Sequence, residues 1–113
     1  MKVPNAEKAE VQEPKIRRYL LDPAHPAGGS KARFFTQFGF GNVTWEKMAD
    51  QLREHVRSHD VVDLRQKEHG TSYAVDGPVD APDRSRLQIR SVWFIDHGGS
   101  IPRFVTAHPL PKS

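Results

Sequence analysis

The spacing of apolar residues changes once along this chain, near His59, and this change constrains the fold more than any other feature. Before it, apolar residues recur every three or four positions, as they do on one side of a helix. From Val61 onward they alternate with polar residues, as they do in a strand. Helices that come first and strands that come second indicate an α+β domain, in which the helices cover one face of the sheet.

Three helices are predicted before the change. The first covers residues 15–21. The second covers residues 31–38 and begins after Ser30, a residue typical of helix N-caps. The third and longest covers residues 45–58 and follows Thr44. Its apolar residues form one continuous stripe that is expected to pack on the sheet.

Four strands are predicted after the change, over residues 61–66, 71–75, 86–95 and 101–108. Residues 76–84 contain Gly, two Pro and three Asp, and are predicted to form a loop. The expected architecture is therefore two or three N-terminal helices packed on a four-stranded, mostly antiparallel sheet.

The length of 113 residues fits one domain, predicted over residues 13–110. Residues 1–12 are polar and are expected to form a flexible N-terminal arm or an edge segment. The chain has no cysteine, which excludes disulfides, thiolate nucleophiles and cysteine-based metal sites. No signal peptide or membrane span is visible, so we expect a cytoplasmic protein without a membrane partner, or one that is delivered into a target cell as part of a larger protein.

The net charge of +3 permits a polyanionic partner without demonstrating one. One segment concentrates groups suited to phosphate: His25, Lys31 and Arg33 surround a glycine-rich helix entry. The candidate backbone donors of this entry are Gly28, Gly29 and Ser30. The same residues are equally compatible with a tight turn between two helices whose charges are solvated.

Two further candidates lie on the predicted strands. Thr106 and His108 are two residues apart and would share a sheet face with Phe104, where they can bind a phosphate oxygen and move a proton. Arg90 stands in the middle of the strongest strand, where it can clamp an anion. The simpler interpretations are an ordinary polar strand end, and an arginine whose stem covers apolar surface.

Two arrangements that resemble metal sites are interpreted as structural. His55 and His59 have a spacing that can chelate zinc, but no third ligand has a suitable sequence spacing, and a solvated helix face is favoured. The carboxylates Asp76, Asp80 and Asp83 miss the spacing of a calcium loop and are read as turn formers. We expect neither a metal nor a cofactor.

Several stretches of this chain resemble a small bacterial domain of unknown function that occurs alone and at the C-termini of polymorphic toxins. The first is LLDPAHPAGGSKARFF over residues 20–35, followed by GF at 39–40. The later ones are YAVDG at 73–77, VWFI at 92–95 and PRFVTAHP at 102–109. The resemblance covers residues 5–110.

The closing strand after helices is also similar to the barnase–EndoU–colicin–RelE superfamily of ribonuclease toxins. This resemblance implies a metal-independent ribonuclease that cleaves RNA by attack of the 2′-OH on the neighbouring phosphate. It implies that His25 and His108 act as acid and base, in either order. It further implies that phosphate is held by Lys31, Arg33 and Arg90 and oriented by Thr106. The expected partners are RNA and a cognate antitoxin or immunity protein. Some members use a glutamate base, for which this chain has no convincing equivalent, because Glu68 lies in a predicted turn.

Two other functions remain open from the sequence. The chain can be a non-catalytic binding module, such as an antitoxin, an immunity protein or an adaptor, with Phe38, Phe40 and Trp93 as contact aromatics. It can also bind nucleic acid without cleaving it, although the small net charge makes this less attractive.

Overall fold

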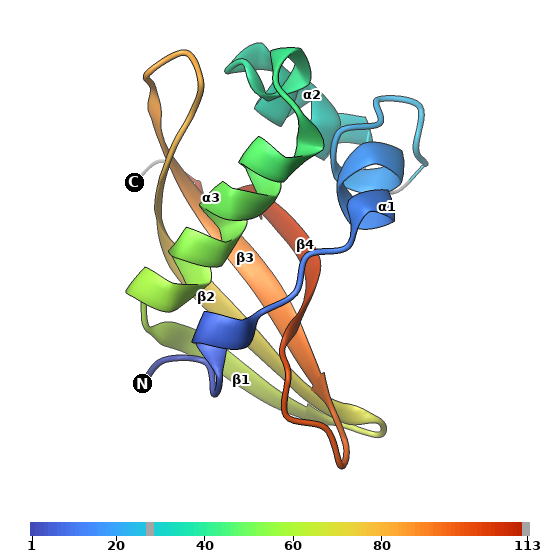
Figure 1. Cartoon of the computed structure of the whole chain (residues 1–113), viewed down its shortest axis with the longest axis vertical. Coiled ribbons are helices and arrows are strands. Elements are labelled where there is room, and N and C mark those ends of the chain that lie inside the picture. The colour runs from blue at the N-terminus through green and yellow to red at the C-terminus, as the bar shows by residue number, and fades with distance from the viewer. Residues whose placement is uncertain (27–28, 112–113) are drawn as a thin grey trace.

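The computed structural model describes residues 1–26 and 29–111. Helix α1 (Glu13–Lys15) continues into a π-helical turn (Ile16–Leu20) and is followed by α2 (Gly29–Gln37) and α3 (Trp45–Ser58). The strands are β1 (Val61–Lys67), β2 (Gly70–Asp80), β3 (Arg86–Asp96) and β4 (Arg103–Pro109), and they form one antiparallel sheet in the order β1-β2-β3-β4. The predicted α+β architecture is confirmed (Figure 1).

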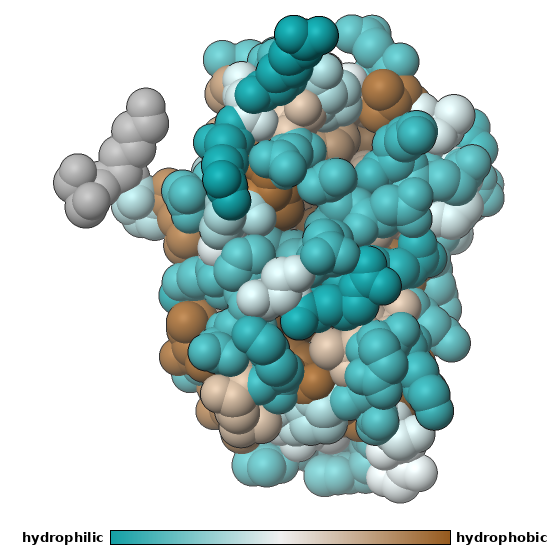
Figure 2. All heavy atoms as spheres, turned by 60° about the vertical axis from the view of Figure 1, so that its left-hand side comes forward, coloured by the Kyte–Doolittle hydropathy of each residue, from teal (hydrophilic) through white to brown (hydrophobic). Residues whose placement is uncertain are grey.

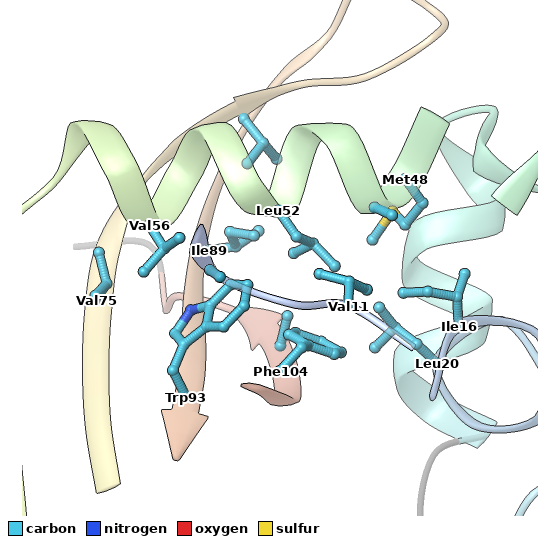
Figure 3. Packing of buried hydrophobic residues seen from close by; sticks show 14 of the residues in the cluster. Val11, Ile16, Leu20, Met48, Leu52, Val56, Val75, Ile89, Trp93 and Phe104 are labelled. Atoms are coloured by element: carbon cyan, nitrogen blue, oxygen red, sulfur yellow. The ribbon is translucent and has the colours of Figure 1, made fainter. Parts of the chain in front are cut away.

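The core lies between α3 and one face of the sheet (Figure 3). From α3, the buried stripe of Met48, Leu52 and Val56 points at the sheet. The sheet contributes Val75, Ile89, Trp93 and Phe104, and the N-terminal helical region contributes Ile16 and Leu20. Trp93 and Phe104 pack edge to face, with ring centroids 5.4 Å apart. Phe40 and Trp93 are fully buried here, so the prediction that they are exposed contact aromatics was wrong.

Strand β2 is longer than predicted, because residues 76–80 continue the ladder with β3 rather than forming a loop. Pro78 is compatible with this extension, since β1 pairs with β2 only up to Val75 and leaves the last part of β2 at an edge. Gly77 is required in it, because a Cβ at this position would collide with the ring of His59.

The N-terminal segment packs on the domain, where a flexible arm over residues 1–12 was one expectation. Val3 and Val11 are only 2% and 5% exposed and belong to the core cluster. Glu10 forms a parallel bridge with Arg103 of β4, with its amide donating to the Pro102 carbonyl. Burial of apolar side chains and this backbone pairing hold the segment against the domain.

Hydrophilic residues cover most of the face in Figure 2, and hydrophobic ones form small separate patches. Two of the most exposed large apolar side chains, Val62 and Leu64, lie on the edge strand β1. In the part of the chain that the structure describes, no helix is long and apolar enough to cross a membrane.

Candidate functional site

The sheet has a second face, which points away from the core and carries most of the candidate site residues. A bulge in β4 determines which residues reach it. Phe104 pairs with Trp93 while Thr106 pairs with Val92, so Val105 is an extra residue without a partner on β3. Phe104 therefore faces the core and Thr106 the outer face. The prediction that Phe104, Thr106 and His108 share one face was wrong for Phe104.

Beyond the bulge the strands pair regularly, and three polar side chains form a row across the outer face. Asp76 on β2, Arg90 on β3 and His108 on β4 stand directly opposite one another. Directly opposed residues of antiparallel strands have their Cβ atoms about 5 Å apart. Thr106 lies on the same face, two residues along β4 from His108.

Lys31 joins this face from helix α2, because the N-terminal helices lie beside β4 (Figure 1). Its Nζ donates hydrogen bonds to the Tyr19 hydroxyl at 2.7 Å and to Thr106 Oγ1 at 3.2 Å. The Tyr19 and Thr106 oxygens are themselves 2.9 Å apart. We call these three residues the Lys31 cluster. All three are half-buried, and they come from a helical turn, a helix and a strand.

The Lys31 cluster contains a cation without an acidic partner. The ion pairs formed within residues 1–26 and 29–111 do not include Lys31. Partial burial acts to raise the pKa of Tyr19, but hydrogen bonds to Lys31 and Thr106 and the positive charges of Lys31 and Lys15 outweigh it, so the pKa is lowered. This favours negative charge at the Tyr19 oxygen.

His25 lies next to the cluster through Tyr19. The two rings pack edge to face with centroids 5.0 Å apart. The structure thus brings His25, Lys31 and Thr106 together around Tyr19, which is not among the predicted site residues. A tyrosine needs a partner for its hydroxyl when it is buried.

The guanidinium of Arg90 forms an ion pair with a carboxylate of the protein, so it is not available as a free clamp for another anion. Its Nε and Nη2 donate to the two carboxylate oxygens of Asp76 at 2.7 and 3.0 Å. These hydrogen bonds raise the pKa of Arg90. This ion pair offsets the free-energy cost of placing a charged side chain in the middle of a strand. Asp76 is therefore a strand residue with an ion-pair partner, and the prediction that it forms a turn was wrong.

The glycine-rich helix entry differs in part from the prediction. Gly28 lies outside the described residues. Helix α2 begins at Gly29, so Ser30 is inside its first turn rather than at the N-cap. Gly29 is buried and its amide donates to the His25 carbonyl, so this donor is already used. Ser30 and Arg33 are exposed.

His55 is buried, not solvated as the sequence analysis favoured. It is 1% exposed, and its Nδ1 and Nε2 lie 2.8 Å from Ser91 Oγ and 3.0 Å from the Gly77 carbonyl. Trp93 Nε1 donates to the same Ser91 hydroxyl. The Gly77 carbonyl can only accept, so Nε2 of the neutral ring carries the proton and Nδ1 accepts from Ser91. Burial lowers the pKa of His55 to about 4. His55 is a core hydrogen-bonding residue, and within the described residues no three potential metal ligands gather.

A family model described as a domain of unknown function, DUF6883, matches residues 2–111, and the chain belongs to this family. A search of curated proteins finds no significant match in sequence. Among solved structures, the chain is similar to one from a contact-dependent growth inhibition toxin–immunity protein complex of Klebsiella pneumoniae 342. The TM-score is 0.71 at 15% sequence identity, over 88% of this chain and 98% of that one. The two chains share a fold.

Proposed function

We propose that this protein is a toxin that cleaves RNA without a metal ion, and that it acts within a system that also holds a cognate immunity protein or antitoxin. The Lys31 cluster carries the proposal, because it places an amine and two hydroxyls around one point, and no carboxylate of residues 1–26 and 29–111 forms an ion pair with the amine. Such a site suits a phosphate whose negative charge grows during the reaction. The fold shared with a chain of a toxin–immunity complex supports a role in such a system.

The reaction follows from the residues that flank the cluster. One of His25 and His108 accepts the proton of an RNA 2′-OH, and the 2′-oxygen bonds to phosphorus. The bond from phosphorus to the 5′-oxygen breaks, and the other histidine gives that oxygen a proton. The products are a 2′,3′-cyclic phosphate and a 5′-hydroxyl. Lys31, Tyr19 and Thr106 stabilise the additional charge on the phosphate oxygens.

Arg90 has a different role in this scheme from the clamp first expected. Its guanidinium stays with Asp76 and stands directly beside His108 in the row across the sheet. The Asp76–Arg90 pair thus stands opposite His108 as a neutral neighbour on the sheet, while Lys31 contacts the phosphate. Arg33 lies one half-turn further along α2, exposed, and attracts the RNA chain by charge alone.

The test is cleavage of single-stranded RNA in the presence of EDTA, with the product ends identified. We expect Lys31→Gln to lower kcat/KM about 100-fold or more, since removing one such donor has this effect in other enzymes. Tyr19→Phe keeps the ring against His25 and removes only the hydroxyl. Lys47→Gln, an exposed lysine on α3, is the matched control and should retain full activity. Equal activity of the Lys31 and Lys47 variants would refute the site.

A non-catalytic role as an immunity-like binding module is the second candidate. It is favoured by Val62 and Leu64, which are 52% and 42% exposed on the edge strand β1, where another protein can pair. Expression of the chain alone in bacteria separates the candidates. A toxin arrests growth unless Lys31 is replaced or its partner is co-expressed, whereas an immunity-like module is tolerated. Salt-sensitive RNA binding without cleavage would indicate a nucleic-acid binder.

A further inference from the structure

A groove lies at the end of the sheet, between α2 and the C-terminal end of β4. Its volume is about 770 Å³, within the range of ligand sites in proteins. Residues of three segments line it, among them Phe34, Phe38, Arg86, Leu87, Gln88 and Leu110. We call it the Phe34 groove. Phe34 and Phe38 are half-buried, with ring centroids 5.3 Å apart.

The Phe34 groove is continuous with the proposed catalytic site along two elements. On α2, Lys31 and Phe34 are three residues apart and share one side of the helix, with Phe34 about 5 Å along the axis from Lys31, and Phe38 follows directly after the end of α2. On the sheet, the Leu110 amide donates to the Gln88 carbonyl, which extends the pairing of His108 with Arg90. The groove therefore lies next to the Lys31 cluster along α2, and next to the His108–Arg90 pair along the sheet.

The lining of the groove has the chemistry of a nucleobase site. Half-exposed aromatic rings offer faces on which a base can stack. Gln88 presents an exposed amide, a group that both donates and accepts hydrogen bonds at a base edge. Arg86 adds a positive charge, and among the described residues that line the groove none carries a carboxylate that would repel RNA.

We propose that the Phe34 groove binds an unpaired nucleobase of the RNA, next to the phosphate held by Lys31, and that it determines at which base the RNA is cleaved. This inference rests on the proposed ribonuclease function. It identifies the substrate as single-stranded RNA, because a base in a duplex is not available to enter the groove.

The test compares RNA oligonucleotides that have one scissile linkage and either a base or an abasic site at the adjacent nucleotide. Phe34→Leu keeps an apolar side chain and removes the aromatic face, and Phe34→Tyr restores that face. We expect Phe34→Leu to lower kcat/KM about tenfold or more on the base-bearing oligonucleotide and to leave the abasic one unchanged. Phe34→Tyr should behave as the wild type. Gln88→Leu should change the order of preference among the four bases.

Equal loss on both oligonucleotides, or no loss with Phe34→Leu, overturns the proposal, provided that thermal melting shows the variant folded. Failure of the ribonuclease function itself has a different signature, namely no cleavage by the wild type. In that case RNA binding, measured by the fluorescence anisotropy of a labelled single-stranded RNA, still tests the groove. An RNA affinity that is weakened by Phe34→Leu and kept by Phe34→Tyr supports the proposal. An RNA affinity that is the same in both variants and the wild type overturns it, as does binding of an apolar peptide without binding of RNA.

Discussion

The stability of this protein should fall in mild acid because of one buried imidazole. His55 is neutral in the folded state: the Gly77 carbonyl can only accept, so Nε2 carries the proton, and Nδ1 accepts from Ser91. A second proton would have to enter the core between Ser91 and Trp93. Burial therefore lowers the pKa of His55 from 6.5 to about 4, an effect that the neighbouring His59 reinforces and Asp76 opposes.

The magnitude follows from proton linkage. The folded pKa is depressed, so the unfolded chain binds more protons below pH 6.5, and stability is lost as the pH falls from 6.5 toward 4. At pH 5 the unfolded imidazole is almost fully protonated and the folded one about one-tenth. The free energy of unfolding should therefore drop by about 2 kcal/mol between pH 7 and pH 5 from His55 alone, at about 1.4 kcal/mol per pKa unit.

Urea unfolding at pH 7 and pH 5 measures this loss. Other groups also titrate in this range, so the contribution of His55 is the difference between the wild type and His55→Gln, which has no group that titrates. His97→Gln, which removes an exposed histidine, is the matched control and should retain the full pH dependence. An equal pH dependence in the wild type and His55→Gln would refute the reasoning. So would an imidazole pKa above 6 for His55 in an NMR titration, which needs no variant.

Three further perturbations test the packing and the ion pair. Gly77→Ala should lower the free energy of unfolding by about 1–3 kcal/mol in urea titrations, because its Cβ displaces the His59 ring from its hydrogen bond with the His55 carbonyl. Leu52→Ala should lower it by about 2–5 kcal/mol, since the fully buried side chain leaves a cavity under α3; a loss below 1 kcal/mol would contradict this packing. Asp76→Asn should cost about 1 kcal/mol at low salt and less in 1 M NaCl, because the pair with Arg90 is about one-third exposed and is screened.

The regular parts of the fold could be predicted because their patterns are strong. The apolar stripe of α3 gives the helix its observed bounds, 45–58, and the alternation over 86–95 gives β3 to within one residue. The N-terminal segment could not be predicted in this way, because its core contacts use two valines and two alanines with no helical or strand periodicity. The burial of His55 had a signal that was overlooked: it follows Leu52 by three residues, on the same stripe.

The candidate site was predicted less completely, since it depends on contacts between distant segments. Lys31 and Thr106 are 75 residues apart and meet only because α2 lies beside β4. Both were selected from residue type, and the structure brings them together. Tyr19, which contacts both residues, was not predicted as a site residue. Sequence spacing indicates on which side of a helix a residue lies, but not which distant groups its hydroxyl contacts.

A single bulge allows β4 to supply side chains both to the core and to the candidate site. Without an extra residue, strict alternation would place Phe104 and Thr106 on one face. Then either Phe104 would leave Trp93 and the core, or Thr106 would turn inward and leave Lys31 without its strand partner. Val105 takes up the extra position, so Phe104 packs at 5.4 Å from Trp93 while Thr106 lies within 3.2 Å of Lys31. Bulges of this kind commonly redirect side chains beside active sites. The bulge therefore allows one strand to supply Phe104 to the core and Thr106 to the Lys31 cluster.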